Sequence, residues 1–245
     1  MDHQKYTYKE MCGDIQSLCK KYSEYVSYET IGYSEEGREI YDVILENKEA
    51  DKTILVISTI HAREYIATVV CMKQLEYYLL NYNKTVDGTK LSEVFAKCNV
   101  HYVMMANPDG VNISQTKKAL WKGNANGVNL NYNFPYAFKK AGSRKNGSFT
   151  GTKAASESET QAIVSLTKKL NKTQTLAVVN YHAMGQIVSG FTSYFCEISR
   201  RTVTNGISVP LVIISGTVPI SSLLEPSGFK PNIIVNCAIN PLFGN

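Results

Sequence analysis

Three runs of apolar residues, rich in β-branched side chains, constrain the fold of this 245-residue chain more than any other feature. The runs cover residues 53–59, 98–105 and 176–181. Between them, residues 66–82 and 156–170 place apolar side chains at helical spacing. Strands that alternate with helices are typical of an α/β sheet with parallel pairs. We therefore predict an α/β fold with a mixed, mostly parallel, twisted sheet and helices on both faces.

The remaining sequence adds further elements to this frame. Residues 8–25 carry apolar side chains at helical spacing, and residues 39–46 have the composition of another strand. Residues 107–110, with the sequence Asn-Pro-Asp-Gly, are typical of a turn. Ser156 is a candidate N-cap for the last predicted helix, because Glu159 follows three residues later.

Length and composition favour one domain. The chain is 44% hydrophobic and 19% charged, and its length suffices for a sizeable buried core. We predict a single domain over residues 1–245, with an atypical tail from about residue 185. The tail is rich in Ser, Ile, Val, Pro and Thr and sparse in charge. A set of buried strands and a segment of different origin both account for this composition.

Charge and cysteine usage narrow the classes of partner. The net charge is +5, and the paired lysines are scattered, which is typical of solvated faces and not of a nucleic-acid track. The chain shows neither an apolar signal peptide nor a membrane span, so we expect a cytoplasmic monomer without membrane contact; secretion by another route is left open. The six cysteines show no Cys-x-x-Cys pairing, which favours buried free thiols.

His61 and Glu64 follow the first apolar run directly and form half of a candidate zinc site. A catalytic zinc ion takes about three protein ligands, commonly His and Asp or Glu, and keeps a fourth position for water. A surface turn in which Glu64 pairs with a nearby cation accounts for the same two residues. The zinc interpretation therefore needs a third ligand.

The search for that ligand is short, because the chain has only four histidines. His182 ends the run over residues 176–181, and open α/β sheets bind ligands at such strand ends. His101 lies inside the run over residues 98–105, so we expect a packed or hydrogen-bonded core histidine there. His3, near the start of the chain, is expected to be disordered.

Four sequence blocks, in this order, resemble the zinc carboxypeptidase family, which includes pancreatic carboxypeptidases and bacterial cell-wall peptidases. They read IGYSEEGREIY at 31–41, STIHAREYI at 58–66, NPDGVNIS at 107–114 with LWKGNANGVNLNYNF at 120–134, and GTKAASESETQAI at 151–163 leading to NYHAMG at 180–185. The resemblance covers nearly three quarters of the chain. It implies a carboxypeptidase-like fold and a bound Zn²⁺ ion.

The resemblance also implies roles for single residues. His61, Glu64 and His182 fall on the three zinc ligands of the family. Arg63 falls on a position that helps to hold the substrate. Lys122 falls where the family usually has an arginine that polarises the scissile carbonyl; lysine keeps that charge but loses the planar fork.

Asn131 and Tyr132 fall on the Asn-Arg pair with which the family grips the terminal carboxylate of its substrate. A phenol cannot replace a guanidinium as a bidentate partner for a carboxylate. We still expect both residues to contact substrate, but the simple clamp on a C-terminus is in doubt. Unusual peptide links, such as those of bacterial cell walls, are therefore a reasonable substrate class.

The general base of the family has no obvious counterpart. In the family it is a glutamate so far beyond the third zinc ligand that the same separation here would pass Asn245. The tail offers only Glu197 and Glu225, of which Glu197 has the context of a strand end. Glu197 is the candidate base, with a surface glutamate as the competing interpretation.

These observations predict a zinc-dependent metallopeptidase of carboxypeptidase type, which hydrolyses a peptide bond near a peptide end with metal-activated water. Its partners would be peptides or cell-wall peptides. The alternative is a catalytically weak or inactive zinc protein that recognises such fragments without cutting them. A purely structural zinc site is disfavoured, because three N and O ligands leave a coordination position open.

Overall fold

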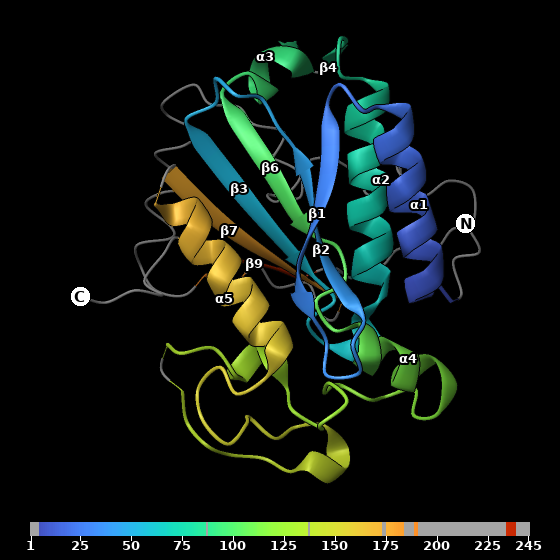
Figure 1. Ribbon diagram of the computed structural model, residues 1–245, viewed down its shortest axis with the longest axis vertical. Coiled ribbons are helices and arrows are strands. Elements are labelled where there is room, and N and C mark those ends of the chain that lie inside the picture. The colour runs from blue at the N-terminus through green and yellow to red at the C-terminus, as the bar shows by residue number, and fades with distance from the viewer. Residues whose placement is uncertain are drawn as a thin grey trace.

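A computed structural model describes residues 5–86, 88–136, 138–172, 175–183, 189–190 and 234–238 of the chain (Figure 1). His3 and Glu197 lie outside these ranges, as does most of the tail from residue 185. Seven of the described strands form one sheet in the order β1-β2-β6-β3-β7-β9-β8. Their bounds are Val26–Tyr33 (β1), Glu39–Leu45 (β2), Lys52–Ser58 (β3), Cys98–Val103 (β6), Thr175–His182 (β7), Ser189–Gly190 (β8) and Ile234–Ala238 (β9). A separate ribbon pairs β4 (Thr85–Val86) with β5 (Thr89–Lys90).

The centre of the sheet is parallel. Strand β3 pairs in parallel with β6 on one side and with β7 on the other, whereas β1, β2 and β9 join antiparallel to their inner neighbours. Ser58 at the end of β3 is in register with Tyr181 of β7. The loops that follow β3 and β7 therefore begin side by side at one end of the sheet.

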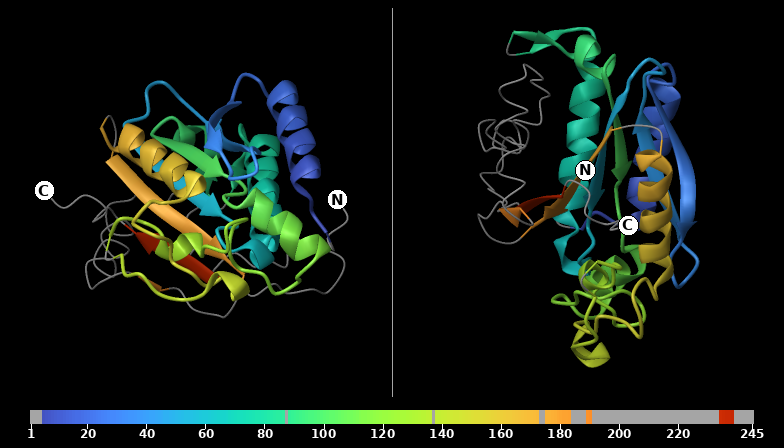
Figure 2. Two further views of the ribbon diagram at one scale, coloured as in Figure 1. Left: turned by 60° about the horizontal axis from the view of Figure 1, so that its bottom comes forward. Right: turned by 90° about the vertical axis from the view of Figure 1, so that its left-hand side faces the viewer.

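Helices cover both faces of the sheet, as Figure 2 shows for α2 and α5. Ile54 and Val56 of β3 pack into the core shared with α1 and α2, and Leu55 and Ile57 pack into the core shared with α5. The predicted α/β class with helices on both faces is confirmed. The helices are α1 (Tyr8–Lys21), α2 (Ile66–Leu80), α3 (Leu91–Phe95), α4 (Pro108–Thr116) and α5 (Ser158–Asn171), with 3-10 turns η1 (Ala62–Glu64), η2 (Leu130–Tyr132) and η3 (Arg144–Asn146). None of the described helices is both long and apolar enough to span a bilayer.

Sequence patterning missed strand β1. The predicted helix over residues 8–25 ends at Lys21, and the chain then enters the edge strand Val26–Tyr33. An edge strand is covered on fewer sides, and most positions of β1 are exposed or half-buried. The period-2 alternation of apolar residues that identifies a strand is therefore weak here.

Two further predictions were wrong, namely the turn at residues 107–110 and the N-cap of the last helix. The sequence at 107–110 is the start of α4, with Asn107 as N-cap accepting a hydrogen bond from the backbone N–H of Gly110 and Pro108 in the first turn. Proline is well tolerated there because its missing N–H would have no helical partner. The N-cap of α5 is Glu157 and not Ser156, whose hydroxyl instead donates to Glu157 Oε1.

Two predictions for single side chains are confirmed. His101 is a buried core histidine whose Nδ1 lies 2.6 Å from Asp42 Oδ2. Cys71 and Cys98 are buried free thiols, and Cys12 and Cys19 are half-buried free thiols. Burial raises the pKa of Cys71 to about 12 and that of Cys98 to about 11, which keeps both thiols protonated near neutral pH.

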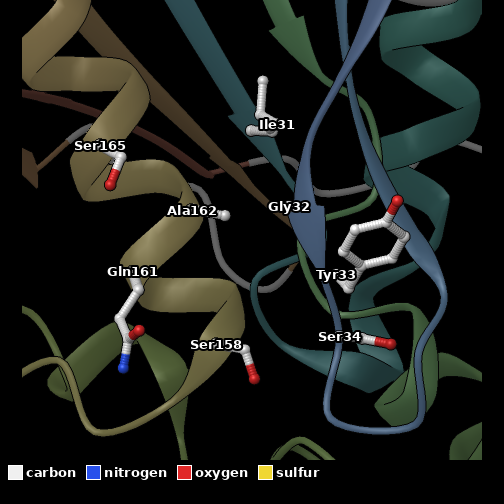
Figure 3. A pocket seen from close by; sticks show the side chains of 8 residues that line it. All are labelled: Ile31, Gly32, Tyr33, Ser34, Ser158, Gln161, Ala162 and Ser165. Carbon is white, nitrogen blue, oxygen red and sulfur yellow. The ribbon is translucent and has the colours of Figure 1, made fainter.

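Strand β1 and helix α5 approach closely at Gly32. Figure 3 shows the Ala162 side chain pointing from α5 towards this glycine, beside a shallow pocket of about 370 Å³ lined by β1 and α5. A Cβ atom on Gly32 would lie 2.7 Å from Cβ of Ala162, which is closer than such atoms pack. None of the predicted site residues lines this pocket.

We predict that Gly32→Ala destabilises the protein by about 1–3 kcal/mol, because β1 and α5 must separate to admit the methyl group. Urea unfolding measures the change. Gly13→Ala is the matched control: this exposed helical position has open space around it, so the same substitution should stabilise α1 by about 0.5–1 kcal/mol. Adding Ala162→Gly to Gly32→Ala should recover part of the loss. A Gly32→Ala protein as stable as wild type would show that the contact is not tight.

Candidate functional site

A strained turn carries the chain from β3 to His61. Thr59 has φ of 54°, a left-handed conformation that β-branched residues rarely adopt. Its hydroxyl lies 2.7 Å from the hydroxyl of Thr68 on α2, which also donates to the carbonyl of Met104 beyond β6. Such strain clusters at functional sites and persists where surrounding contacts hold it. The turn leads directly into η1, for which His61 is the N-cap.

His61, Glu64 and His182 converge on one point. His61 Nδ1 lies 3.0 Å from Glu64 Oε1, His182 Nδ1 lies 2.9 Å from Glu64 Oε2, and the two Nδ1 atoms are 3.1 Å apart. The backbone N–H of Ala183 also donates to Glu64 Oε2 at 3.3 Å. The structure thus brings together the three residues predicted as metal ligands, hereafter the His-Glu-His triad, from η1 and the end of β7.

The triad is buried and electrostatically coupled. Each of its residues exposes 5% or less of its surface. Burial by itself would raise the pKa of Glu64, but hydrogen bonds with His182 and His61 outweigh burial and hold that pKa well below its usual range. Burial lowers the pKa of His61 despite the opposing hydrogen bond with Glu64. The carboxylate therefore stays ionised and His61 tends towards the neutral form that binds a metal.

The donor set of the triad fits zinc. Two imidazole nitrogens and a carboxylate form one of the known catalytic zinc ligand sets. Ligands at about 2.0–2.2 Å from a tetrahedral zinc ion lie about 3.3 Å from one another, close to the separations within the triad. Within the described residues, the buried Nε2 atoms of both histidines have no hydrogen-bond partner. The Nδ1 atoms face a shared ligand, because they lie within 3.1 Å of each other and each lies within 3.0 Å of a Glu64 oxygen.

Lys122 lies next to the triad. Its carbonyl accepts a hydrogen bond from the backbone N–H of Ala62 at 3.1 Å, so its loop is tied to η1. The Lys122 side chain is half-buried, and burial lowers the pKa of its ammonium group, an effect that Glu64 opposes. This places a cationic side chain beside the pair of predicted ligands in η1.

The predicted substrate contacts lie in η1 and η2. Arg63 is half-buried in η1, and Tyr132 is 60% exposed at the end of η2. Asn131 accepts a hydrogen bond from Nδ2 of Asn180 on β7 at 3.4 Å. Asn180 was not predicted as a site residue, although its position two residues before His182 on the same strand was the available signal.

Asn107 was also missed as a residue that shapes the site. Its side-chain amide donates to the carbonyls of Ile60, directly before His61, and Gly123, directly after Lys122. One buried amide therefore holds the loop that carries His61 against the loop that carries Lys122. The Asn-Pro dipeptide at a helix start was the signal that could have identified it.

A second buried polar centre lies around Asn124. Its amide donates to Glu157 Oε2 at 2.9 Å and to Glu159 Oε2 at 3.1 Å, and Glu35 lies in the same cluster. Glu159 is fully buried, and its Oε1 has no partner among the described residues. Burial, reinforced by the charges of Glu35 and Asp109, raises the pKa of Glu159 to about 7.

Comparison with known sequences identifies related proteins. The sequence profile of the zinc carboxypeptidase family matches residues 11–209. Metallocarboxypeptidase A of Arthroderma otae is 31% identical over 198 residues, covering 75% of this chain and 46% of that protein. Gamma-D-glutamyl-L-diamino acid endopeptidase 1 of Lysinibacillus sphaericus is 28% identical over 255 residues, covering 93% of this chain and 62% of that protein. The chain spans about half the length of the fungal relatives it matches.

Solved structures share the fold. Bovine thrombin-activatable fibrinolysis inhibitor, determined in complex with tick carboxypeptidase inhibitor, aligns with a TM-score of 0.71 and 20% identity over 96% of this chain and 86% of that chain. Carboxypeptidase A from Helicoverpa armigera aligns with a TM-score of 0.68 and 21% identity over 97% of this chain and 58% of that chain. These likenesses support the α/β carboxypeptidase-like fold predicted from the sequence.

We predict that Glu159→Gln gains stability relative to wild type as the pH rises from 4.5 to above 7. Protonated Glu159 favours the folded state, and this contribution is fully present below its ordinary pKa of 4.5 and lost as the pH rises to about 7. The loss amounts to about 3 kcal/mol, which the neutral amide should avoid. Urea unfolding of variant and wild type across this pH range measures the difference.

Glu157→Gln is the matched control for that measurement. Glu157 accepts hydrogen bonds from Ser156 at Oε1 and from Asn124 and Asn126 at Oε2, and glutamine keeps only one of these two acceptor oxygens. This variant should therefore be destabilised at every pH. If the stability of Glu159→Gln followed that of wild type between pH 4.5 and 8, Glu159 would not titrate in this window.

Proposed function

The chain belongs to the zinc carboxypeptidase family, and on this basis we propose that it is a zinc-dependent metallopeptidase that hydrolyses a peptide bond near the end of a peptide. The observation that carries the proposal is the convergence of two Nδ1 atoms and one carboxylate in the buried triad of His61, Glu64 and His182. These residues would hold the Zn²⁺ ion. A zinc ion there supplies Lewis-acid polarisation of a peptide carbonyl and activates water for attack.

The chain's own residues would then orient the substrate and move the proton. Lys122 places a positive charge where oxygen of the scissile carbonyl becomes negative, and Arg63 and Asn131 would hold the peptide. A general base must be a separate carboxylate, because Glu64 would be a ligand of the zinc ion. We propose Glu197 as this base.

The replacement of an arginine clamp by Tyr132 favours substrates that are not held by a free terminal carboxylate. We propose peptides of unusual linkage, including cell-wall peptides, as the substrate class. The relative from Lysinibacillus sphaericus, named as a gamma-D-glutamyl-L-diamino acid endopeptidase, supports this extension. We also propose that the chain acts as a monomer.

The alternative, a recognition protein without catalytic activity, is not favoured. The relatives that match most of this chain are named as peptidases. An assay of the zinc-loaded full chain on a peptide mixture distinguishes hydrolysis from recognition. New peptide termini are detected by mass spectrometry. We expect cleavage; binding without any new terminus would favour recognition.

His61→Ala should abolish stoichiometric zinc binding, because two protein ligands are too few for a stable catalytic site. Zinc per chain, measured by inductively coupled plasma mass spectrometry after dialysis, should fall from near one to near zero. Arg63→Ala is the matched control within the same turn, and it should retain the metal. Unchanged zinc in His61→Ala would refute the ligand assignment.

Glu197→Gln should lower kcat by about 100-fold or more while zinc content stays the same, since the amide cannot accept the proton of the attacking water. Glu225→Gln removes the other glutamate of the tail and should leave kcat within about two-fold of wild type. Equal kcat for wild type and Glu197→Gln would show that another group is the base. That result would leave the zinc-peptidase proposal itself intact.

A further inference from the structure

One long segment beside the triad carries charge of a single sign. Residues 117–153, hereafter the basic segment, contain eight lysines and arginines and no aspartate or glutamate, although the whole chain has 21 acidic residues. The eight are Lys117, Lys118, Lys122, Lys139, Lys140, Arg144, Lys145 and Lys153. All except the half-buried Lys122 are exposed.

These cationic groups are not neutralised within the described part of the protein. None of the eight forms an ion pair with a described aspartate or glutamate. Lys118 and Arg144 instead lie over the rings of Trp121 and Phe149, at 4.7 and 4.6 Å. The neighbouring Glu157 accepts hydrogen bonds from asparagine amides and is buried. The positive charge of the seven exposed side chains therefore faces solvent.

The structure holds the basic segment in a defined shape. Thr150 donates to the carbonyl of Lys139 at 2.8 Å and accepts from the backbone N–H of Ala141 at 2.9 Å. The amide of Asn133 donates to the carbonyls of Thr150 and Lys153. Internal hydrogen bonds fix the backbone of the basic segment at these points. Its charged side chains therefore project from ordered loops.

The basic segment borders the proposed catalytic site. Figure 1 shows its loops, in green to yellow, at the end of the molecule where β3 and β7 lead into the triad. Lys122 is hydrogen-bonded through its carbonyl to η1, and Asn131 is hydrogen-bonded to β7. A peptide bound at the triad would therefore lie near the part of the basic segment that carries Lys122 and Asn131.

We propose that the basic segment selects peptides rich in carboxylates, so that the substrates of the proposed peptidase are acidic peptides. The inference rests on the proposed function and adds the charge class of its substrate. Several ammonium groups of the basic segment lack an ion-pair partner in the described structure. Such a group of like charges raises the local concentration of anions and speeds their association with the protein. Lysine suits this task because it attracts carboxylates as a mobile point charge, without the fixed geometry of a terminal clamp.

The test compares two charge-reversed variants of the full chain. Lys139→Glu, Lys140→Glu and Lys145→Glu are combined in one variant, since these exposed side chains have no partner in the described structure. The matched control combines Lys20→Glu, Lys48→Glu and Lys97→Glu, which change the net charge equally. The control residues are exposed and lie near the opposite end of the sheet, beside the starts of β1, β3 and β6.

Binding is measured by fluorescence anisotropy with labelled oligoglutamate, oligoglutamine and oligothymidylate of matched length. Wild type should bind oligoglutamate best, and the affinity should fall between about 50 and about 500 mM NaCl. The segment variant should weaken binding of oligoglutamate by about ten-fold or more, and the control by less than about two-fold. Unfolding midpoints check that both variants are folded.

Three binding results would overturn the inference. These are equal weakening by both variants, equal binding of oligoglutamine, and binding of oligothymidylate as tight as that of oligoglutamate, which would indicate a nucleic-acid surface. Peptide hydrolysis by wild type without preference for acidic sequences would also overturn it but leave the proposed function standing. Charge-dependent binding of oligoglutamate without hydrolysis of any peptide would overturn the proposed function instead.

Discussion

The parallel pairing of β3 with β7 is the constraint on which the rest of the site depends. It sets Ser58 opposite Tyr181, so the two loops that carry His61 and His182 leave the sheet at neighbouring points. Glu64 then joins the two imidazoles with both of its carboxylate oxygens. A shift of either strand along the other would separate the histidines, because each residue of slip moves a strand by about 3.3 Å.

Buried asparagine amides hold the loops around the triad in place. Asn107 holds the loop of His61 against that of Lys122, and Asn124 anchors the latter to Glu157 and Glu159. These polar side chains satisfy backbone and carboxylate groups that would otherwise be buried without partners. The basic segment can therefore expose its lysines while its backbone remains fixed, and it borders the site with positive charge.

Much of the fold and of the candidate site was predictable from local patterns. Strand β3 is a continuous apolar run because both of its faces are buried, and the position of His61 directly after that run marked a strand end. Strand β1 escaped prediction because an edge strand needs little apolar patterning. Asn107 escaped because an asparagine that joins two distant loops has the same local sequence as one in an ordinary turn. Asn180 escaped because its contact with Asn131 depends on the packing of β7 against a loop far away in the chain.

The sequence by itself determined the fold class, the residue types of the triad and the one-signed charge of the basic segment, because periodicity, composition and motif spacing are properties of the linear chain. Only the tertiary structure decided that the Nδ1 atoms of the two histidines converge, that Lys122 adjoins η1, and that Glu159 is buried beside other carboxylates. These facts depend on strand register and on contacts between residues far apart in the chain, and neither is encoded in any local stretch of sequence.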